Sequence, residues 1–343
     1  MYLKRFGKIP SGERLAKIQK SPNYKFGAFV NLEFTPNFSE HFSWKKLIKA
    51  YIKPTDKNPV PTKKIPHLKT DLQKNNFDNS IVWLGHSSYF MRLDGHNILV
   101  DPVLSGHASP FSFLIKSFDG SNPFSVSDLP DIDFLILTHD HYDHLDYDTM
   151  VRIKPKIKKI ITSLGVGEHL EYWGYSSKII EELDWHDTTT LTENMIITAT
   201  PARHFSGRMF KRNKSLFSSF VLKSKDLNLF LGGDSGYGTH FKTIGELYGP
   251  FDFAILETGQ YNLFWKNIHA MPDEMTTIIA ELKANRVIPV HHSKFKLALH
   301  DWDEPLEEIY KNSREKNIKL FTPKIGEVLS LFEEKQFDKW WEI

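Results

Sequence analysis

The chain has 343 residues, 40% of them hydrophobic and 25% charged, which is ordinary for a globular protein with one large domain or two smaller ones. Its 44 Lys and Arg balance 42 Asp and Glu, so the formal net charge is +2, and this argues against a dedicated nucleic-acid-binding protein. Cysteine is absent, which excludes disulfides, thiolate metal ligands and a cysteine nucleophile, and leaves His, Asp and Glu to bind any metal.

No apolar run reaches the ~18 residues that a membrane-spanning helix needs. Met1 to Lys20 is basic but lacks the apolar core of a secretory signal. We therefore expect a cytoplasmic protein, while peripheral contact with a membrane and a signal removed from the chain both stay open.

Residues 1–75 differ from the rest in their many lysines, prolines and aromatic residues without a clear period. Ser43 to Lys53 predicts a short basic amphipathic helix with a Ser43 N-cap, and Pro54 to Pro66 predicts an extended linker. The simpler interpretation of 1–75 is an N-terminal extension that packs on a main domain, residues 76–343. The alternative is a membrane-facing surface, because lysines beside Trp, Leu, Ile and Tyr suit a lipid interface.

From Asn79 onward, apolar runs typical of strands alternate with helix patterns. Asp94-Gly95 is a strong hairpin signal between two of the first strands. We predict strands at 81–84, 89–93, 97–100, 134–137, 160–162, 195–198, 219–222, 227–231, 253–256 and 287–290. We predict helices at 147–153, 167–172, 243–248, 272–284 and 305–316.

The most distinctive stretch, His-Asp-His-Tyr-Asp-His at 139–144, follows the apolar run 134–137 directly. His139 and His141 are two residues apart, so in an extended segment both imidazoles leave the same face. Asp143 and His144 follow where the chain bends, and imidazole with carboxylate suits Zn and its first-row neighbours. The alternative is a solvated turn that is rich in histidine by chance.

Four other strand-like runs also lead to a residue that can bind or orient a metal: Asp101, His204, Asp234 and His291. Strand ends on one side of a sheet are where sites are commonly assembled. We assign His139, His141 and His204 to a first metal, Asp143, His144 and His291 to a second, and Asp234 to a bridging position. Three protein ligands with an open position is the catalytic pattern. Two ions ~3.5–4 Å apart can share a hydroxide, with Zn expected and Mn or Fe as alternatives.

Asp101 and His86 are expected to orient metal ligands, and the alternative for Asp101 is a turn cap before Pro102. His291 and His292 are adjacent, so only one of them points inward from a strand; we favour His291 and keep His292 as the alternative.

His269, which precedes a predicted helix, could contact substrate or protonate a leaving group. The alternative for His269 is an ordinary loop histidine. Asp234 and Asp143 complete the set of catalytic candidates.

The ordered series Asp101, His139-x-His141-x-Asp143-His144, His204, Asp234 and His291 resembles the metallo-β-lactamase superfamily. Further motifs resemble the N-acyl-phosphatidylethanolamine-hydrolysing phospholipases D and their bacterial relatives, over about residues 79–330: Trp83-Leu84-Gly85-His86, His107-Ala108-Ser109-Pro110, Pro201-Ala202-x-His204 and Gly233-Asp234-Ser235-Gly236-Tyr237. The resemblance implies an α/β fold of the four-layer αββα sandwich type, with a dinuclear site at the edge of two sheets. It matches His269 to a family histidine near the metals, but His292 stands where the family commonly has Trp.

The function that the resemblance implies is a phosphodiesterase of phospholipase D type, acting on an N-acyl-phosphatidylethanolamine-like lipid through a metal-bridging hydroxide. Apolar stretches at 111–118 and 262–265 could line an acyl groove or else pack in the core. Alternatives are a hydrolase of a small soluble ester such as a sugar-phosphate lactone, a nuclease, and a metal-binding protein without turnover. Expected partners are a phospholipid or small ester substrate, without dedicated nucleic-acid binding, and a homodimer stays open.

Overall fold

The computed structural model describes residues 2–36, 38–52, 57–74, 78–208 and 210–343, and these contain two seven-stranded sheets. The first sheet, in the order β16-β3-β4-β5-β6-β7-β8, comprises β3 (Ser80–Trp83), β4 (Tyr89–Leu93), β5 (His96–Val100), β6 (Ile132–Leu137), β7 (Ile157–Ser163), β8 (Ile180–Leu183) and β16 (Val328–Ser330). The second, in the order β15-β14-β13-β12-β11-β10-β9, comprises β9 (Thr188–Thr192), β10 (Met195–Pro201), β11 (Ser218–Lys223), β12 (Asn228–Leu231), β13 (Phe253–Glu257), β14 (Arg286–Val290) and β15 (Lys319–Leu320).

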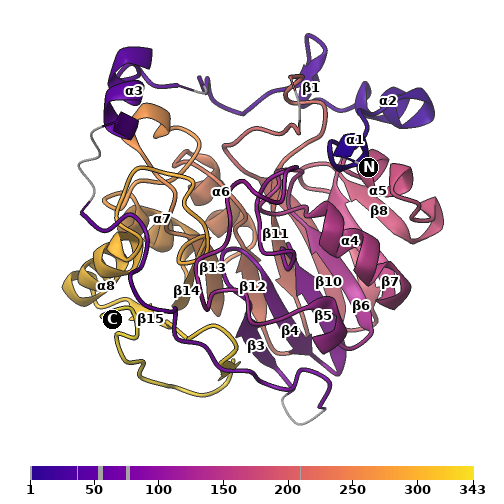
Figure 1. Cartoon of the computed structure of the whole chain (residues 1–343). Coiled ribbons are helices and arrows are strands. Elements are labelled where there is room, and N and C mark those ends of the chain that lie inside the picture. The colour runs from indigo at the N-terminus through magenta and orange to yellow at the C-terminus, as the bar shows by residue number, and fades with distance from the viewer. Residues whose placement is uncertain (1, 37, 53–56, 75–77, 209) are drawn as a thin grey trace.

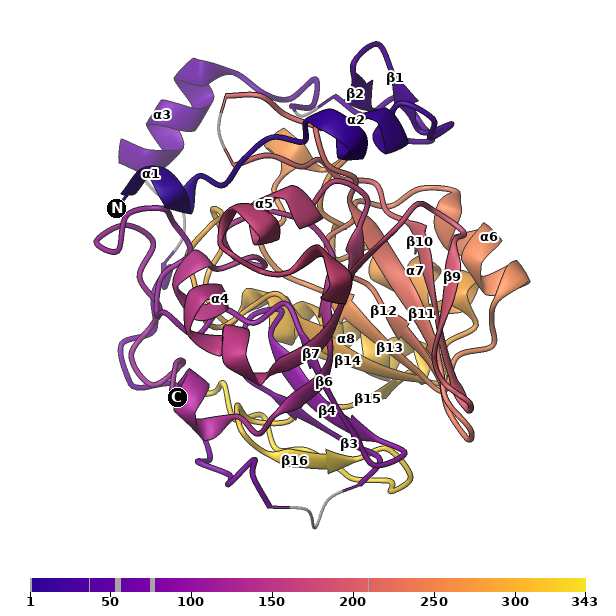
Figure 2. The same cartoon turned by 90° about the vertical axis from the view of Figure 1, so that its right-hand side faces the viewer.

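Helices cover the outer face of each sheet (Figures 1 and 2). The helices α4 (Tyr147–Ile153) and α5 (Gly167–Tyr172) lie outside the first sheet, and α6 (His240–Leu247), α7 (Met275–Leu282) and α8 (Glu304–Lys316) lie outside the second. This order of helices, sheet, sheet and helices is the four-layer αββα sandwich, so the predicted fold class is confirmed.

Both sheets change from antiparallel to parallel pairing partway across. β3, β4 and β5 pair antiparallel, whereas β5 to β8 pair parallel. The second sheet repeats this change at β12, after which β13, β14 and β15 run parallel. Parallel neighbours need a crossover. Each of the five outer helices lies in one of these crossovers, and the crossover from β5 to β6 contains only a short 3-10 helix, Val126–Asp128. The carboxyl ends of β5 and β6, and those of β12, β13 and β14, therefore lie side by side.

The core lies between the two sheets and under the helices. Phe90 and Leu135 from the first sheet, and Phe220 and Phe230 from the second, are completely buried in one hydrophobic cluster. β3 and β13 are buried along their whole length, because a sheet covered on both faces has no solvent side. A continuous apolar run such as 253–256 is the sequence pattern of such a strand.

The N-terminal segment crosses the top of the molecule in Figure 1 and contains α1 (Tyr2–Arg5), α2 (Gly12–Ile18), β1 (Tyr24–Lys25), β2 (Ala28–Phe29) and α3 (Trp44–Ile52). Ile18 and Phe29 are buried against Trp185 and Phe217 of the main body, so this part of the segment packs on it.

The predicted helix at 43–53 corresponds to α3, and Lys53 lies outside the described residues. Residues 54–56 of the predicted linker also lie outside them, and 57–66 contain neither helix nor strand. No helix in the described residues combines the length and the apolar character needed to cross a membrane.

Candidate metal centre

The predicted site residues converge at one edge of the two sheets. His86 lies in the turn between β3 and β4, and residues 139–144 follow β6. The second sheet contributes His204 after β10, Asp234 after β12 and His291 after β14. Both sheets therefore contribute side chains to the site.

The backbone is unusual at three of these turns. His86, Asp101 and His291 have φ values of 54°, 40° and 67°, in the left-handed region that residues other than glycine rarely adopt. Such residues are typical of sites where the surrounding structure imposes a conformation, at a cost on the order of 1–3 kcal/mol each. The turns hold these side chains in place at the expense of local strain.

His139, His141, His204 and Asp234 form the first group of converging side chains. His141 Nδ1 lies 3.0 Å from His139 Nε2 and 3.1 Å from His204 Nε2. Asp234 Oδ2 is 3.8 Å from His139 Nε2 and 3.7 Å from His204 Nε2. Four ligands at ~2.1 Å from a tetrahedral Zn would lie about 3.4 Å apart, so the spacing suits such an ion.

Burial is the main cause that lowers the pKa of His139, His141 and His204, so their rings are neutral at neutral pH. His204 Nδ1 donates to the Ile268 carbonyl at 2.8 Å, which leaves the lone pair on Nε2. A neutral imidazole with its lone pair turned inward is the form that binds a metal.

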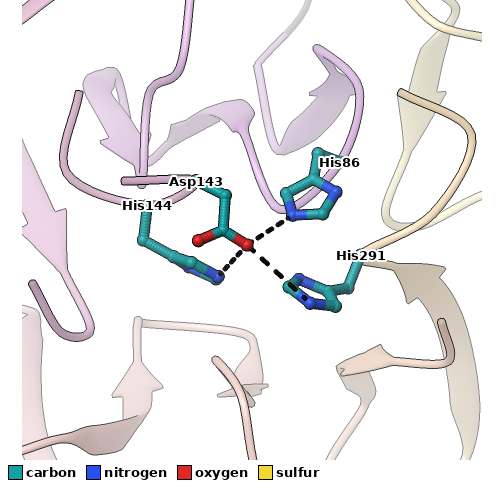
Figure 3. A group of neighbouring side chains, drawn as sticks. All are labelled: His86, Asp143, His144 and His291. Carbon is teal, nitrogen blue, oxygen red and sulfur yellow. Dashed lines mark hydrogen bonds and ion pairs between the residues drawn. The ribbon is translucent and has the colours of Figure 1, made fainter. Parts of the chain in front are cut away.

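His86, Asp143, His144 and His291 form the second group (Figure 3). Asp143 Oδ2 lies 3.0 Å from His86 Nε2, 3.7 Å from His144 Nε2 and 4.0 Å from His291 Nε2. His86 was expected to orient a ligand, and its contact with Asp143 is the one that this role requires. The structure also places the His86 ring among the converging ligand-type atoms.

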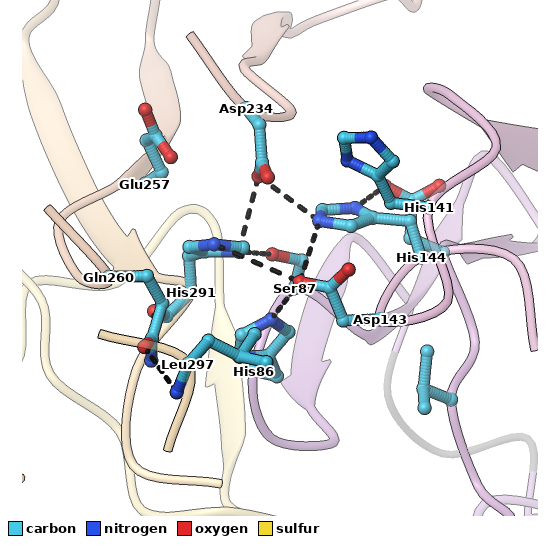
Figure 4. Close-up of polar contacts among 12 residues, drawn as sticks. His86, Ser87, His141, Asp143, His144, Asp234, Glu257, Gln260, His291 and Leu297 are labelled. Atoms are coloured by element: carbon cyan, nitrogen blue, oxygen red, sulfur yellow. Dashed lines mark hydrogen bonds and ion pairs between the residues drawn. The ribbon is translucent and has the colours of Figure 1, made fainter. Parts of the chain in front are cut away.

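Asp234 contacts residues of both groups, and Figure 4 shows its contacts with His144 and His291 of the second group. Its Oδ1 is 3.1 Å from both His144 Nε2 and His291 Nδ1, while its Oδ2 faces the first group. One carboxylate oxygen directed at each group is the geometry that a bridging ligand requires.

Two atoms of the second group and one oxygen of Asp234 test whether a cation fits there. Among the described residues, His144 Nε2, His291 Nε2 and Asp234 Oδ1 are buried and form no hydrogen bond of acceptable geometry, although Asp234 Oδ1 lies 3.1 Å from His144 Nε2. Leaving a buried polar atom unpaired costs about 1–3 kcal/mol. A divalent cation would satisfy the lone pairs of these atoms, so the side chains fit a metal.

Asp101 contacts a residue of the second group rather than serving only as a turn cap. Its Oδ2 accepts from His144 Nδ1 at 2.8 Å and from the Thr138 hydroxyl at 2.6 Å, and its Oδ1 accepts from the Thr138 N–H. A carboxylate on the outer nitrogen of a histidine fixes its tautomer and leaves Nε2 for a metal.

His292 is not a member of either group. It packs on Trp83 at 4.8 Å between ring centroids, and its Nε2 lies 3.2 Å from the Pro289 carbonyl. His291 is the histidine that the structure brings to the site, and Ser87, which the sequence did not single out, contacts His291 Nδ1 through its hydroxyl at 2.9 Å.

His269 reaches the same cavity, beside a residue that the sequence reasoning missed. Its Nδ1 donates to Oε2 of Glu257 at 2.7 Å, and Glu257 ends β13. Burial opposes the charged form of His269, but Glu257 raises its pKa to about 9. Burial raises the pKa of Glu257 above its usual value. An acidic residue at the end of the apolar run 253–256 was the available signal.

A cavity of about 310 Å³ opens onto both groups. Phe38, Phe205, Trp265, Ile268 and Leu297 form apolar walls, and Arg212 and Gln260 add polar groups. Both apolar stretches, 111–118 and 262–265, were predicted to line an acyl groove or to pack in the core. Of their residues, only Trp265 lines the cavity. Phe113, Leu114 and Ile115 are instead exposed, because local apolarity does not determine which way a loop faces. A larger cavity of about 840 Å³, between α6, α7 and α8, is lined by none of the side chains of the two groups.

Comparison with known proteins agrees with the fold. The family model of the beta-lactamase superfamily domain matches residues 96–292. An uncharacterized protein of Mycobacterium tuberculosis is 32% identical over 330 residues, which covers 95% of this chain and 88% of that protein. The N-acyl-phosphatidylethanolamine-hydrolyzing phospholipase D 1 of Caenorhabditis elegans is 31% identical over 264 residues, 72% of this chain and 74% of that protein.

Among solved structures, the metallo hydrolase Igni18 of Ignicoccus hospitalis superposes with a TM-score of 0.56 at 19% identity, over 73% of this chain and 97% of that one. At this identity the likeness concerns the fold alone. The family match spans more than half of the chain, and it is on this ground that the protein belongs to the metallo-β-lactamase superfamily, as a metal-dependent hydrolase.

Proposed function

We propose that the protein is a phosphodiesterase of phospholipase D type, which acts on an N-acyl-phosphatidylethanolamine-like lipid. The observation that carries this proposal is the cavity. Side chains from both groups of converging residues and Asp234 line it, and apolar side chains with one arginine form the rest of its walls. The C. elegans relative, named for hydrolysis of such a lipid, supports the same substrate class.

The proposed ligands are His139, His141 and His204 for one ion, Asp143, His144 and His291 for the other, and Asp234 for both. When bound, two divalent ions would activate water and neutralise charge on the phosphodiester. The protein itself orients the ligands through Asp101, which fixes His144, and through His86, which contacts Asp143. His269 reaches the cavity from the side of the second sheet and can hydrogen-bond a substrate oxygen.

Arg212 is the residue that favours an anionic ester. It lines the cavity, and its guanidinium carbon lies 4.7 Å from the centroid of the Phe205 ring. An arginine held on an aromatic face presents a forked donor set that matches a phosphate. Phe38 and Trp265 on the same walls suit an acyl chain.

The test is a substrate screen with protein loaded with Zn. We expect phosphatidic acid to be released from N-acyl-phosphatidylethanolamine in mixed micelles, and about two ions bound per chain. Asp234→Asn and His139→Ala should abolish turnover, whereas His96→Ala, at the opposite end of β5, should retain it. Activity in both site variants would contradict the site assignment. Opening of a sugar-phosphate lactone without phosphatidic acid release would select the soluble-ester alternative.

We propose in addition that α3 and the turn at 263–265 face a membrane. Trp44, Ile48 and Leu263 are 65%, 54% and 55% exposed, and lysines 45, 46 and 49 are exposed on the same helix. The Ser39 N–H donates to the Phe264 carbonyl at 2.8 Å, which ties this segment to the cavity wall. Apolar and basic side chains together suit an anionic lipid surface.

Sedimentation with phosphatidylglycerol-containing vesicles tests the membrane proposal. Trp44→Ala with Ile48→Asp should weaken vesicle binding, and pure phosphatidylcholine vesicles should bind the unchanged protein less. Leu247→Asp, at an exposed leucine of α6, is the matched control and should bind normally. Equal binding by all variants would contradict a role for α3.

A further inference from the structure

Glu257 is a buried acidic residue beside the two groups, and it is not one of the seven proposed metal ligands. It is 5% exposed and is the last residue of β13. Together with Asp234, His269 and His291 it forms a third set of side chains whose ligand-type atoms converge. Its position alone would allow either a metal-ligand role or a role in orienting another residue.

The hydrogen bonds of Glu257 distinguish these two roles. Its Oε1 accepts from the backbone N–H groups of Ser235 at 2.9 Å and Ala270 at 3.2 Å. Its Oε2 accepts from His269 Nδ1 at 2.7 Å. Both oxygens are thus engaged by the two loops that carry Asp234 and His269. The shortest of these contacts is the one with the His269 ring, and none of them is with the carboxylate of Asp234.

The hydrogen bond with Glu257 determines which ring nitrogen of His269 can contact other groups. Nδ1 of His269 donates its proton in the hydrogen bond to Glu257. Nε2 is therefore the ring nitrogen of His269 that can contact another group. The His269 ring stacks on His291, with 5.3 Å between centroids, and lies 5.1 Å from His204, so the ring sits against both groups. His269 lines the cavity, whereas Glu257 does not.

We propose that Glu257 is a positioning residue that fixes the orientation of His269 through its Nδ1–H, so that Nε2 of His269 is the atom that contacts a substrate oxygen. The inference deepens the proposed hydrolytic function and rests on it for the identity of the reaction. Glu257 acts only through His269 and does not touch the substrate. A carboxylate behind a functional histidine is a general way to fix its tautomer.

The experiment uses the Zn-loaded protein and four variants: Glu257→Gln, Glu257→Asp, His269→Gln and the double variant Glu257→Gln/His269→Gln. Glutamine keeps the size and two acceptor lone pairs but loses the charge. We expect Glu257→Gln to lower kcat by about 10- to 100-fold, as for other residues that support a site histidine, with KM and bound Zn nearly unchanged. Aspartate, which keeps the carboxylate, should restore part of kcat.

The double variant separates positioning from general stabilisation. If Glu257 acts through His269, then Glu257→Gln should have no further effect on kcat once His269 is glutamine. Glu304→Gln is the matched control, because Glu304 also accepts a side-chain hydrogen bond, from the Tyr261 hydroxyl at 2.7 Å, outside the metal-type groups. It should leave kcat unchanged. A full additional loss in the double variant, or loss of Zn in Glu257→Gln, would overturn the inference.

A second readout does not depend on turnover. In protein labelled with ¹⁵N at histidine, His269 should show a protonated Nδ1 that exchanges slowly, and Glu257→Gln should change this signal while other site histidines keep theirs. An unchanged His269 signal would overturn the inference. If the unchanged protein hydrolyses no ester offered, the proposed function fails, and the NMR result alone decides the role of Glu257.

Discussion

Asp101 and His144 are joined by a hydrogen bond of 2.8 Å, from His144 Nδ1 to the carboxylate, deep in the edge shared by the two sheets. Asp101 is 1% exposed and His144 is completely buried. This contact directs His144 Nε2 toward Asp234, 3.1 Å away. The position of a proposed metal ligand is therefore set by a residue 43 positions earlier in the chain.

Asp101→Asn should weaken metal binding without unfolding the protein. Asparagine has the same size and tolerates the φ of 40° found at Asp101, but its amide is a weaker acceptor for His144 Nδ1–H. We expect Zn affinity to fall roughly 10- to 100-fold, measured by competition with a chelator. Asp133→Asn, on β6 at the far end of the sheet, is the control. Equal affinities in all three proteins would contradict the role of Asp101.

Metal binding should release protons at neutral pH. Burial opposes the charged form of His144, yet Asp234, Asp143 and Asp101 raise its pKa well above its usual value. A metal needs the deprotonated ring, so apparent Zn affinity should rise with pH. Calorimetry in buffers of different ionisation enthalpy measures the released protons. Zn binding at pH 7 without proton release would contradict this pKa.

Apparent Zn affinity should rise with pH, but the same raised pKa of His144 should make the stability of the metal-free protein fall as pH rises. Charged His144 contributes stability that is fully present below the unfolded pKa of about 6.5. That contribution is lost as pH rises through the higher folded pKa. The midpoint of thermal unfolding of the metal-free protein should therefore fall with rising pH in that range, and His144→Gln should remove this part of the pH dependence.

Arg14→Ala should destabilise the protein by loosening the N-terminal segment. Arg14 donates to Glu182, Glu168 and Glu171 at 2.7, 2.8 and 2.7 Å, and it is mostly buried. Its removal leaves three crowded carboxylates, so we expect a loss of about 1.5–3 kcal/mol in the free energy of unfolding. Urea unfolding measures it. Lys17→Ala, at an exposed neighbour, should change stability by less than about 0.5 kcal/mol, and equal effects would contradict the prediction.

Arg212→Ala should discriminate between charged and neutral esters. If Arg212 binds a phosphate, its loss should raise KM for a phosphodiester roughly tenfold, which corresponds to about 1.4 kcal/mol. KM for a neutral lactone or carboxylic ester should not change. Lys211→Ala, one residue earlier and also exposed, is the control. A similar rise in KM for both ester classes would show that Arg212 shapes the cavity rather than binding the charge.

The order of strands and site residues was predictable because each predicted metal ligand lies shortly after an apolar run that folds as a buried strand. The run 134–137 leads into the histidine cluster, and 287–290 leads to His291, in the sequence as in the structure. The pattern of apolar runs is enough to predict that these residues lie close together, because the ends of neighbouring strands meet at the edge of a sheet. Which of His291 and His292 faces inward depended on the turn, whose φ of 67° at His291 no periodicity predicts.

Other features depend on contacts between distant segments. Thr188–Thr192 forms β9 at a sheet edge, although its polar composition lacks the apolar alternation of a strand. Glu257 looks like the ordinary polar end of an apolar run until His269, twelve residues later, folds back onto it. The docking of Ile18 and Phe29 likewise needs partners more than 130 residues away. Local sequence predicts such elements poorly because their partners are remote.

The division of the site between the two sheets sets an order of events during synthesis. When the ribosome has made β3 to β8, which are all strands of the first sheet except β16, it has produced His86 and residues 139–144, but His204, Asp234 and His291 are still to come. If these are the ligands, no ion can be fully bound until β14 has been made and the second sheet has closed on the first. Metal uptake would then be one of the last steps of maturation, and a bound ion would link the strands made early in synthesis to those made late.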